Sequence, residues 1–204
     1  MFDCCGAEKH EWDRLKVELH WVPLVLRCFI VGENPGDTKS EHFYQRPASY
    51  TLDKVAVRRG LLRGLHQQGL IAEATLEGFR DAGFLFDHAI RCQLSSKVVG
   101  LEREKAKRYA SYRAESVNHL RPWLAQARVV WVMGHLASNA VANATPEFPK
   151  HERKISMSPY PDEIAPNSRF FVSEYLSWRT GEKAPAFAEA FKQFACERDV
   201  FDDI

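Results

Sequence analysis

The sequence predicts an α/β protein in which helices cover a parallel β-sheet. The segments at residues 24–31, 84–91 and 129–133 are mainly apolar and have the length of strands, and a glycine directly follows the first and the third. The stretches between these runs carry apolar residues at helical spacing. Strand and helix alternating along a chain produce a parallel sheet with helices on its faces. At 204 residues and 45% hydrophobic content, the chain can form one core, so we expect a single domain over residues 1–204.

The first 69 residues contain two expected helices and one strand. Residues 3–20 carry Trp12, Leu15 and Leu19 at helical spacing. The apolar run at residues 24–31 is the first strand, and a loop follows it to about Ser49. Residues 52–68 have the spacing of an amphipathic helix, which Gly69 ends.

The rest of the chain continues the alternation. We expect strands at residues 84–91, 129–133 and 170–175, and helices at residues 101–127, 135–143 and 184–196. The helix at 101–127 is either continuous or restarted near Pro122. Residues 144–168 contain five prolines and form a long loop of the kind that is functional or mobile.

Charge, hydropathy and cysteine content narrow the classes of protein. The net charge is only +1, so any contact with nucleic acid must be local. No stretch approaches the roughly 20 apolar residues of a membrane span, and no signal segment opens the chain. We therefore expect a soluble cytoplasmic protein with no membrane partner. The five cysteines form no CxxC pair or disulfide framework, so we expect reduced thiols, with Cys28 a small core residue.

The loop after the first strand carries the strongest functional signal. Gly32-Glu33-Asn34-Pro35-Gly36-Asp37 places two glycines and a proline around a carboxylate and an amide, so backbone N–H groups can turn toward a ligand at the strand's carboxyl end. An ordinary turn is the alternative, in which Asn34 bonds the backbone and Asp37 or Thr38 caps the next helix.

The pentapeptide Gly32-Glu33-Asn34-Pro35-Gly36 resembles motif A of the uracil-DNA glycosylase superfamily. It is similar both to GINPG of the mismatch-specific enzymes and to GEAPG of the iron–sulfur, family-4 enzymes. Four further segments resemble family motifs in the family's order, FAHPAN, TNVVKC, CRPWL and the segment ending in LGxxA. These segments are residues 44–49, 86–92, 120–124 and 129–137. The resemblance covers about residues 24–142 and implies a three-layer α/β/α fold with a short central parallel sheet.

The resemblance implies a monofunctional uracil-DNA glycosylase, which hydrolyses the N-glycosidic bond of a flipped uracil or another deaminated base and leaves an abasic site for base-excision repair. Asn34 stands at the position of the water-orienting Asn, and an amide can position water without being a strong base. Glu33 matches the acid of GEAPG, where it either stabilises the sugar cation or braces the loop. Gly32, Gly36 and Asp37 complete the substrate loop, whose N–H groups are the natural donors to the leaving base.

Three residues outside the loop are candidates for contact with the base. Tyr44 stands where the mismatch-specific enzymes stack a Phe on the base, with Phe43 as the fallback; either is otherwise a loop anchor in the core. His88 stands where family-4 enzymes have an Asn that reads uracil, and a neutral imidazole also offers one donor and one acceptor. The alternative for His88 is a buried histidine satisfied by backbone. Asp87 should point to the opposite face of the strand.

The C-terminal third departs from the family. Residues 170–179 stand where the family has an HPS-like tripeptide, and they contain no His. If the alignment holds, Ser173, Glu174 or Tyr175 lies near the base, and Leu176, Trp178 and Arg179 belong to a loop that enters the minor groove. Further DNA contacts are expected from Lys39, Arg46, Lys97 and Lys183. Arg58, Arg59 and Arg63 are expected to form a solvated helix face.

The resemblance also bears on cofactors and partners. Leu120 replaces the helix cysteine of the family-4 cluster and Cys4-Cys5 lacks its spacer, although Cys92 matches, so we expect neither an iron–sulfur cluster nor any other metal or cofactor. The expected partner is DNA that contains uracil or another deaminated base, bound by a monomer, at the nucleoid if the protein is bacterial. Two other classes stay open: a damage-binding module without turnover, and a nucleotide-binding protein that uses the Gly32–Gly36 loop as an anion nest.

Overall fold

The computed structural model describes residues 13, 15–35, 42–45, 56–91, 101–148, 169–173 and 183–201, with the backbone alone for residues 56 and 101–112. In this part of the chain, a parallel sheet contains β1 (Cys28–Gly32), β2 (Phe84–His88), β3 (Val129–Met133) and β4 (Phe170–Ser173), in the order β2-β1-β3-β4. All residues of β1, β2 and β3 are buried, as expected for parallel strands that are covered on both faces.

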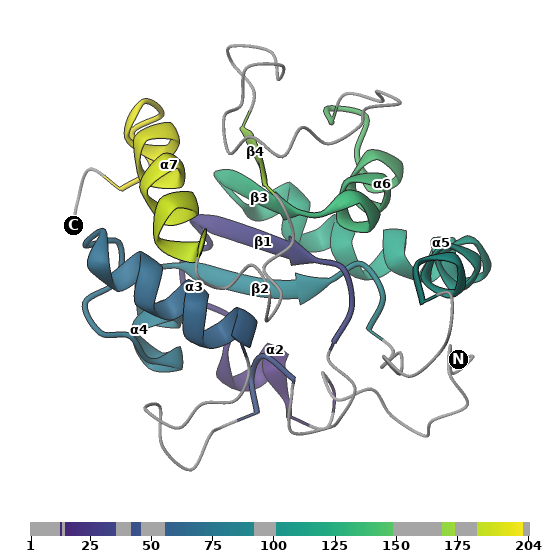
Figure 1. Ribbon diagram of the computed structural model, residues 1–204, viewed down its shortest axis with the longest axis horizontal. Helices are drawn as coiled ribbons and strands as arrows, with labels where there is room; N and C mark the ends of the chain where they lie inside the picture. The colour runs from purple at the N-terminus through teal and green to yellow at the C-terminus, as the bar shows by residue number, and fades with distance from the viewer. Residues whose placement is uncertain are drawn as a thin grey trace.

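Helices cover both faces of this sheet (Figure 1). On one side lie α3 (Ala56–Gln67), α4 (Leu76–Asp81) and α7 (Ala184–Cys196), with α3 packed on α7. On the other side α5 (Leu101–Gln126) packs on α6 (His135–Ala144). A short helix, α2 (Val17–His20), precedes β1. The α/β class predicted from the sequence is therefore confirmed, and the arrangement agrees with three layers.

Aromatic side chains fill the core between the sheet and α7. The Trp131 ring stacks on Phe191 with centroids 4.8 Å apart and an interplanar angle of 14°. Phe171 and Phe84 also lie against Phe191. Burial of such large rings contributes most of the apolar area that stabilises a core of this size.

Most elements match the sequence prediction, and the differences have local causes. The first strand begins at Cys28 rather than residue 24, because Leu24 and Val25 are exposed and the chain reaches the sheet only where Arg27 and Cys28 donate to Gly83 O. Helix α4 was not predicted; Thr75 caps it by accepting a hydrogen bond from Gly78 N–H at 3.0 Å.

Three further differences concern helix continuity and strand length. The expected helix at residues 3–20 is interrupted at Lys16, whose φ of 49° is left-handed, and residues 3–12 lie outside the described part. α5 runs continuously through Pro122, which decides between the two possibilities for that segment. β2 ends at His88 rather than residue 91, since Ala89 and Ile90 donate to the carbonyls of Gly32 and Glu33 beyond the ladder.

No helix in the described part of the chain combines the length and the apolar character that a membrane span needs.

Candidate functional site

The candidate site lies where the parallel strands end. Gly32, the last residue of β1, is in register with His88, the last residue of β2. Met133 and Ser173 end β3 and β4 side by side. The chain leaves β1 for β2 on one side and returns to β3 on the other, so the β1–β3 border is a topological switch point, where open α/β sheets bind ligands.

Glu33 points from this border toward the first turn of α6. Its Oε1 accepts a hydrogen bond from Leu136 N–H at 3.4 Å, and the residue is buried. Gly134 directly precedes α6 as its N-cap with a φ of +93°, and a Cβ there would lie 2.6 Å from Glu33 Oε1. A carboxylate at a helix N-terminus is favoured by the helix dipole. Glu33 therefore ties the β1 loop to α6, on the face opposite to α7.

Asn34 is also buried, and its amide orientation is fixed by its own loop. Nδ2 donates to Pro35 O at 2.7 Å. Nδ2 carries a second proton, and Oδ1 is the acceptor of the side chain. The backbone of the same loop is bonded to the end of β2, since Gly32 O and Glu33 O accept from Ala89 and Ile90.

His88 is buried beside a second histidine that the sequence did not single out. The His88 and His42 rings meet edge to face with centroids 5.8 Å apart, and Phe86 lies against His88 at 4.8 Å. Burial lowers the pKa of His88 to about 3, with His42 acting in the same direction. Burial likewise lowers the pKa of His42 to about 4. Both imidazoles are therefore neutral at neutral pH.

Asp87 points to the opposite face from His88, as alternation along the strand requires. It is completely buried and paired with Arg91, with Nη2 and Oδ2 2.6 Å apart. Burial raises the pKa of Asp87, but Arg91 and His119 outweigh that effect, so its pKa is below the ordinary 3.8. His119 and Ser116 of α5 approach the same strand end. The only sequence signal for this group is the Asp87 to Arg91 spacing.

Phe43 and Tyr44 are both 2% exposed. Phe43 stacks on Phe86 with centroids 4.4 Å apart, and Tyr44 stacks on Trp21 at 5.8 Å. The Tyr44 hydroxyl accepts a hydrogen bond from Phe86 N–H at 2.7 Å. These are the contacts of loop anchors in the core, which is one of the two roles the sequence leaves open for this pair.

Arg58 contradicts the prediction of a solvated basic face on α3. It is 1% exposed, whereas Arg59 and Arg63 are exposed. Its guanidinium donates to the carbonyls of Phe43, at 2.7 Å, and of His42 and Gln45. The prediction was wrong because a guanidinium can be buried when backbone carbonyls satisfy its donors. Arg58 therefore ties the 42–45 turn to α3.

The remaining predicted residues are placed as follows. Ser173 is fully buried, and its Oγ accepts from Trp131 Nε1 at 2.8 Å. Gly32 gives room to the Phe86 ring, since a Cβ there would lie 2.7 Å from Phe86 Cζ. Lys183 is exposed at the start of α7. Gly36, Asp37, Lys39, Arg46, Lys97, Glu174, Tyr175, Leu176, Trp178 and Arg179 lie outside the described residues.

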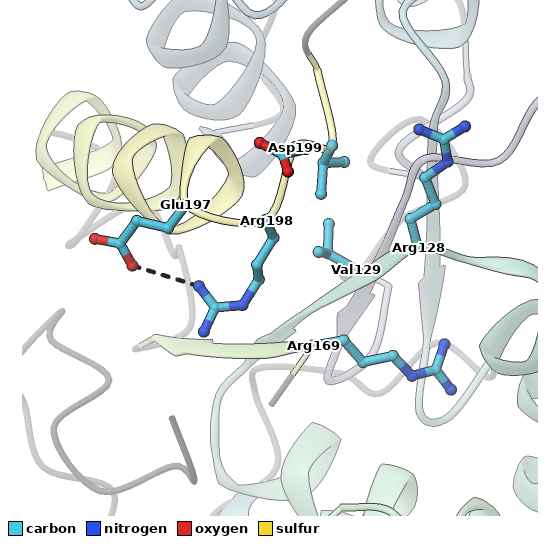
Figure 2. A pocket seen from close by; sticks show the side chains of 7 residues that line it. Arg128, Val129, Arg169, Glu197, Arg198 and Asp199 are labelled. Atoms are coloured by element: carbon cyan, nitrogen blue, oxygen red, sulfur yellow. Dashed lines mark hydrogen bonds and ion pairs between the residues drawn. The ribbon is translucent and has the colours of Figure 1, made fainter. Parts of the chain in front are cut away.

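A hollow of about 570 Å³ lies at the other end of the sheet, near the first residue of β3 (Figure 2). The guanidinium groups of its three arginines do not point toward a common place where a ligand could bind. Arg169 is paired with Glu147 at 2.8 Å, Arg198 with Glu197 at 3.5 Å, and the Arg128 guanidinium points away from the hollow. A smaller hollow of about 450 Å³ lies beside Trp21 and Tyr44. Neither hollow is lined by Glu33, Asn34 or His88.

Cysteine and metal chemistry can be assessed only for the described residues. Cys28 is buried and Cys196 is exposed, and both are free thiols. Cys28 is 0% exposed, which confirms its place in the core, and this burial raises the pKa of its thiol. Within the described ranges, no group of three or more His, Cys, Asp or Glu side chains is placed to hold a metal ion.

Neither a scan against protein-family models nor a search of curated proteins finds a match for this chain.

Proposed function

We propose that the protein is a monofunctional uracil-DNA glycosylase that acts on a base flipped out of DNA and leaves an abasic site. The observation that carries the proposal is the position of Glu33 and Asn34, which directly follow β1 at the switch point and lie next to the strand end that carries His88. The motif resemblance assigns a role to each of these three residues. The glycosylase-like version of the three-layer fold is part of the same proposal.

Asn34 positions the water that attacks the sugar. Uracil leaves as an anion while the sugar becomes cation-like, so a strong general base is not required if the leaving group is stabilised. In this role Oδ1 accepts from the water, while Nδ2 donates to Pro35 O. Backbone N–H groups of the loop supply donors to the leaving base.

Glu33 braces this loop in the proposal. Its contact with Leu136 N–H favours the bracing role over direct contact with the sugar, because the carboxylate is directed to α6. His88 reads the base as a neutral imidazole with one donor and one acceptor. These groups lie on opposite sides of the ring, so discrimination among deaminated bases is looser than an Asn would give.

The proposed partner is DNA that carries uracil or another deaminated base, bound by a monomer without a metal or cofactor. Binding requires extrusion of the base, which costs a few kcal/mol and is cheapest in single strands and mismatches. Activity should therefore be tested on both single and double strands.

The experiment is cleavage of end-labelled oligonucleotides that carry one uracil, hypoxanthine or xanthine, followed by alkali to break abasic sites. The variants are Asn34→Ala and, as a control, Asn118→Ala, whose side chain is exposed on α5. We expect alkali-dependent breaks for wild type and Asn118→Ala and a loss of at least 100-fold for Asn34→Ala, on the order of an essential positioning contact.

Other outcomes would separate the remaining classes. Binding to the lesion duplex without breaks would assign the protein to damage recognition without turnover. Neither breaks nor binding, combined with stabilisation by free nucleotides, would favour the nucleotide-binding class.

A further inference from the structure

The backbone of His88 is held from both sides by side chains that do not touch its ring. Its N–H donates to Asp87 Oδ1 at 2.7 Å. Its carbonyl accepts from His119 Nε2 at 2.9 Å. The ring itself lies on the opposite face of β2, against Phe86 and His42. The charges of the two groups act on the ring through space, since Asp87 raises and His119 lowers the pKa of His88. Their hydrogen bonds act on the ring only by positioning the strand end.

Arg91 fixes the carboxylate that receives the His88 N–H. Its Nε lies 3.2 Å from both oxygens of Asp87, and its Nη2 lies 2.6 Å from Oδ2. The Asp87 side chain is 0% exposed and that of Arg91 12%. Because desolvation offsets most of the attraction in such a buried pair, it adds little stability compared with an apolar pair. The Asp87–Arg91 pair is therefore better explained by a role in positioning the strand end than by a contribution to stability.

Helix α5 holds the same strand end with two side chains on one face. Ser116 and His119 are three residues apart, so they lie on the same side of the helix. Ser116 Oγ donates to Ala89 O, and His119 Nε2 donates to His88 O. With its proton on Nε2, the neutral His119 leaves Nδ1 as a buried nitrogen without a hydrogen-bond partner in the described part of the chain. Leaving a buried polar atom unmatched costs about 1–3 kcal/mol.

We propose that Asp87, Arg91 and His119 are positioning residues that hold the end of β2, and through it the His88 ring, in the geometry that reads the flipped base. This proposal rests on the proposed function, because it assigns His88 to the base. The three residues act on the reaction only through His88. A displacement of about 1 Å in a group that contacts the base can lower the rate on the order of 100-fold. Loss of Asp87, Arg91 or His119, called the clamp below, can therefore have a large effect on the rate.

The test compares His119→Leu, which removes the donor to His88 O, with His119→Gln, whose Nε2 can still donate to that carbonyl. On uracil-containing DNA, we expect kcat to fall about tenfold or more in His119→Leu and to stay within about threefold of wild type in His119→Gln. In a His88→Ala background, adding His119→Leu should cause no further loss. Equal fractional losses in both backgrounds, or no loss in either, would overturn the proposal.

A second readout does not depend on activity. In protein labelled with ¹⁵N-histidine, the His88 ring should give one set of signals in wild type and His119→Gln, and shifted or doubled signals in His119→Leu. Identical His88 signals in all three proteins would refute the clamp even in an active enzyme. If the wild type releases no uracil, the proposed function fails, and the spectra still decide whether His119 orients His88.

If His119→Leu does not fold, Asp87→Asn replaces it in both measurements. The amide keeps an oxygen to accept the His88 N–H and removes the charge that pairs with Arg91. The clamp is supported if Asp87→Asn lowers kcat in the wild type but causes no further loss in the His88→Ala background. Unchanged kcat together with unchanged His88 signals rejects it.

Discussion

The carboxylate of Glu33 lies directly against the α-carbon of Gly134. A Cβ on Gly134 would approach Glu33 Oε1 to 2.6 Å and Cδ to 3.0 Å, and the backbone there has a φ of +93°. Two features of position 134, at the start of α6, therefore favour glycine. One is the positive φ of its backbone, and the other is the room that a missing side chain leaves for Glu33.

Gly134→Ala should lower the free energy of unfolding by about 3 kcal/mol, combining strain at positive φ with overpacking against Glu33. Gly69→Ala is a control for positive φ alone, since Gly69 has a φ of +71° and a Cβ there meets nothing within 4 Å. The ψ of 170° at Gly134 adds backbone strain that this control does not include. That control should cost only about 1–2 kcal/mol in urea unfolding. Adding Glu33→Ala to Gly134→Ala should recover most of the difference, and no recovery would show that the contact is unimportant.

Arg58→Met should destabilise the protein by on the order of 3 kcal/mol, because three backbone carbonyls in the 42–45 turn lose a charged donor. Arg63→Met changes an exposed residue of the same helix and should stay within about 0.5 kcal/mol of wild type. Chemical denaturation of the two variants checks the pair. Equal effects would mean that burial of the Arg58 guanidinium contributes nothing.

Stability should fall as the pH drops below 6.5. The pKa of His88 is lowered to about 3 and that of His42 to about 4, so between these values and 6.5 the unfolded chain binds protons that the folded chain does not. The stabilisation is complete above pH 6.5 and is lost on acidification at roughly 1.4 kcal/mol per pH unit for each histidine, until the folded-state pKa is reached. Asp87, whose pKa is below 3.8, adds a loss only at still lower pH.

Urea unfolding at pH 7, 6 and 5 measures this dependence. His88→Gln should reduce the slope between pH 6 and 5 by about one proton, because glutamine does not titrate. A slope that is the same in the variant and the wild type would contradict the assignment of a neutral, buried His88.

Tyr44→Phe should cost about 1–3 kcal/mol, because it removes the oxygen that accepts the Phe86 N–H and leaves that buried donor unmatched. Hydrogen exchange provides the measurement. The Phe86 amide should exchange faster in the variant, while the amide of Ile30 in β1 should be less affected. Unchanged exchange at Phe86 would mean that the hydroxyl does not protect it.

The strands and most helices follow from the sequence because their signals are local. Val129–Met133 is apolar throughout and ends at a glycine, and its predicted and observed bounds agree. Residues 24–27 show where the same reasoning fails, since Leu24 and Val25 are apolar yet exposed. Whether an apolar residue joins a strand depends on where Gly83 receives the chain, which is a tertiary property.

The residues of the candidate site also fall into those that the sequence predicts and those that it does not. Glu33 and Asn34 could be named because they follow an apolar run at a strand end, and His88 because the resemblance places it where family-4 enzymes have an Asn. The buried roles of Arg58, Ser116 and His119 could not be predicted, because each depends on a carbonyl from a distant part of the chain. A charged or polar residue on a helix looks solvated in the sequence until its long-range acceptor is known.

Side-chain acceptors along the outer edge of β2 also limit self-association. In the described part of the chain β2 is at the edge of the sheet, and two of its N–H groups, those of Phe86 and His88, are bonded to Tyr44 Oη and Asp87 Oδ1. A strand from another molecule would have to displace both acceptors before it could pair there. Exposed strand edges are templates for aggregation, and this one is closed by the chain's own side chains.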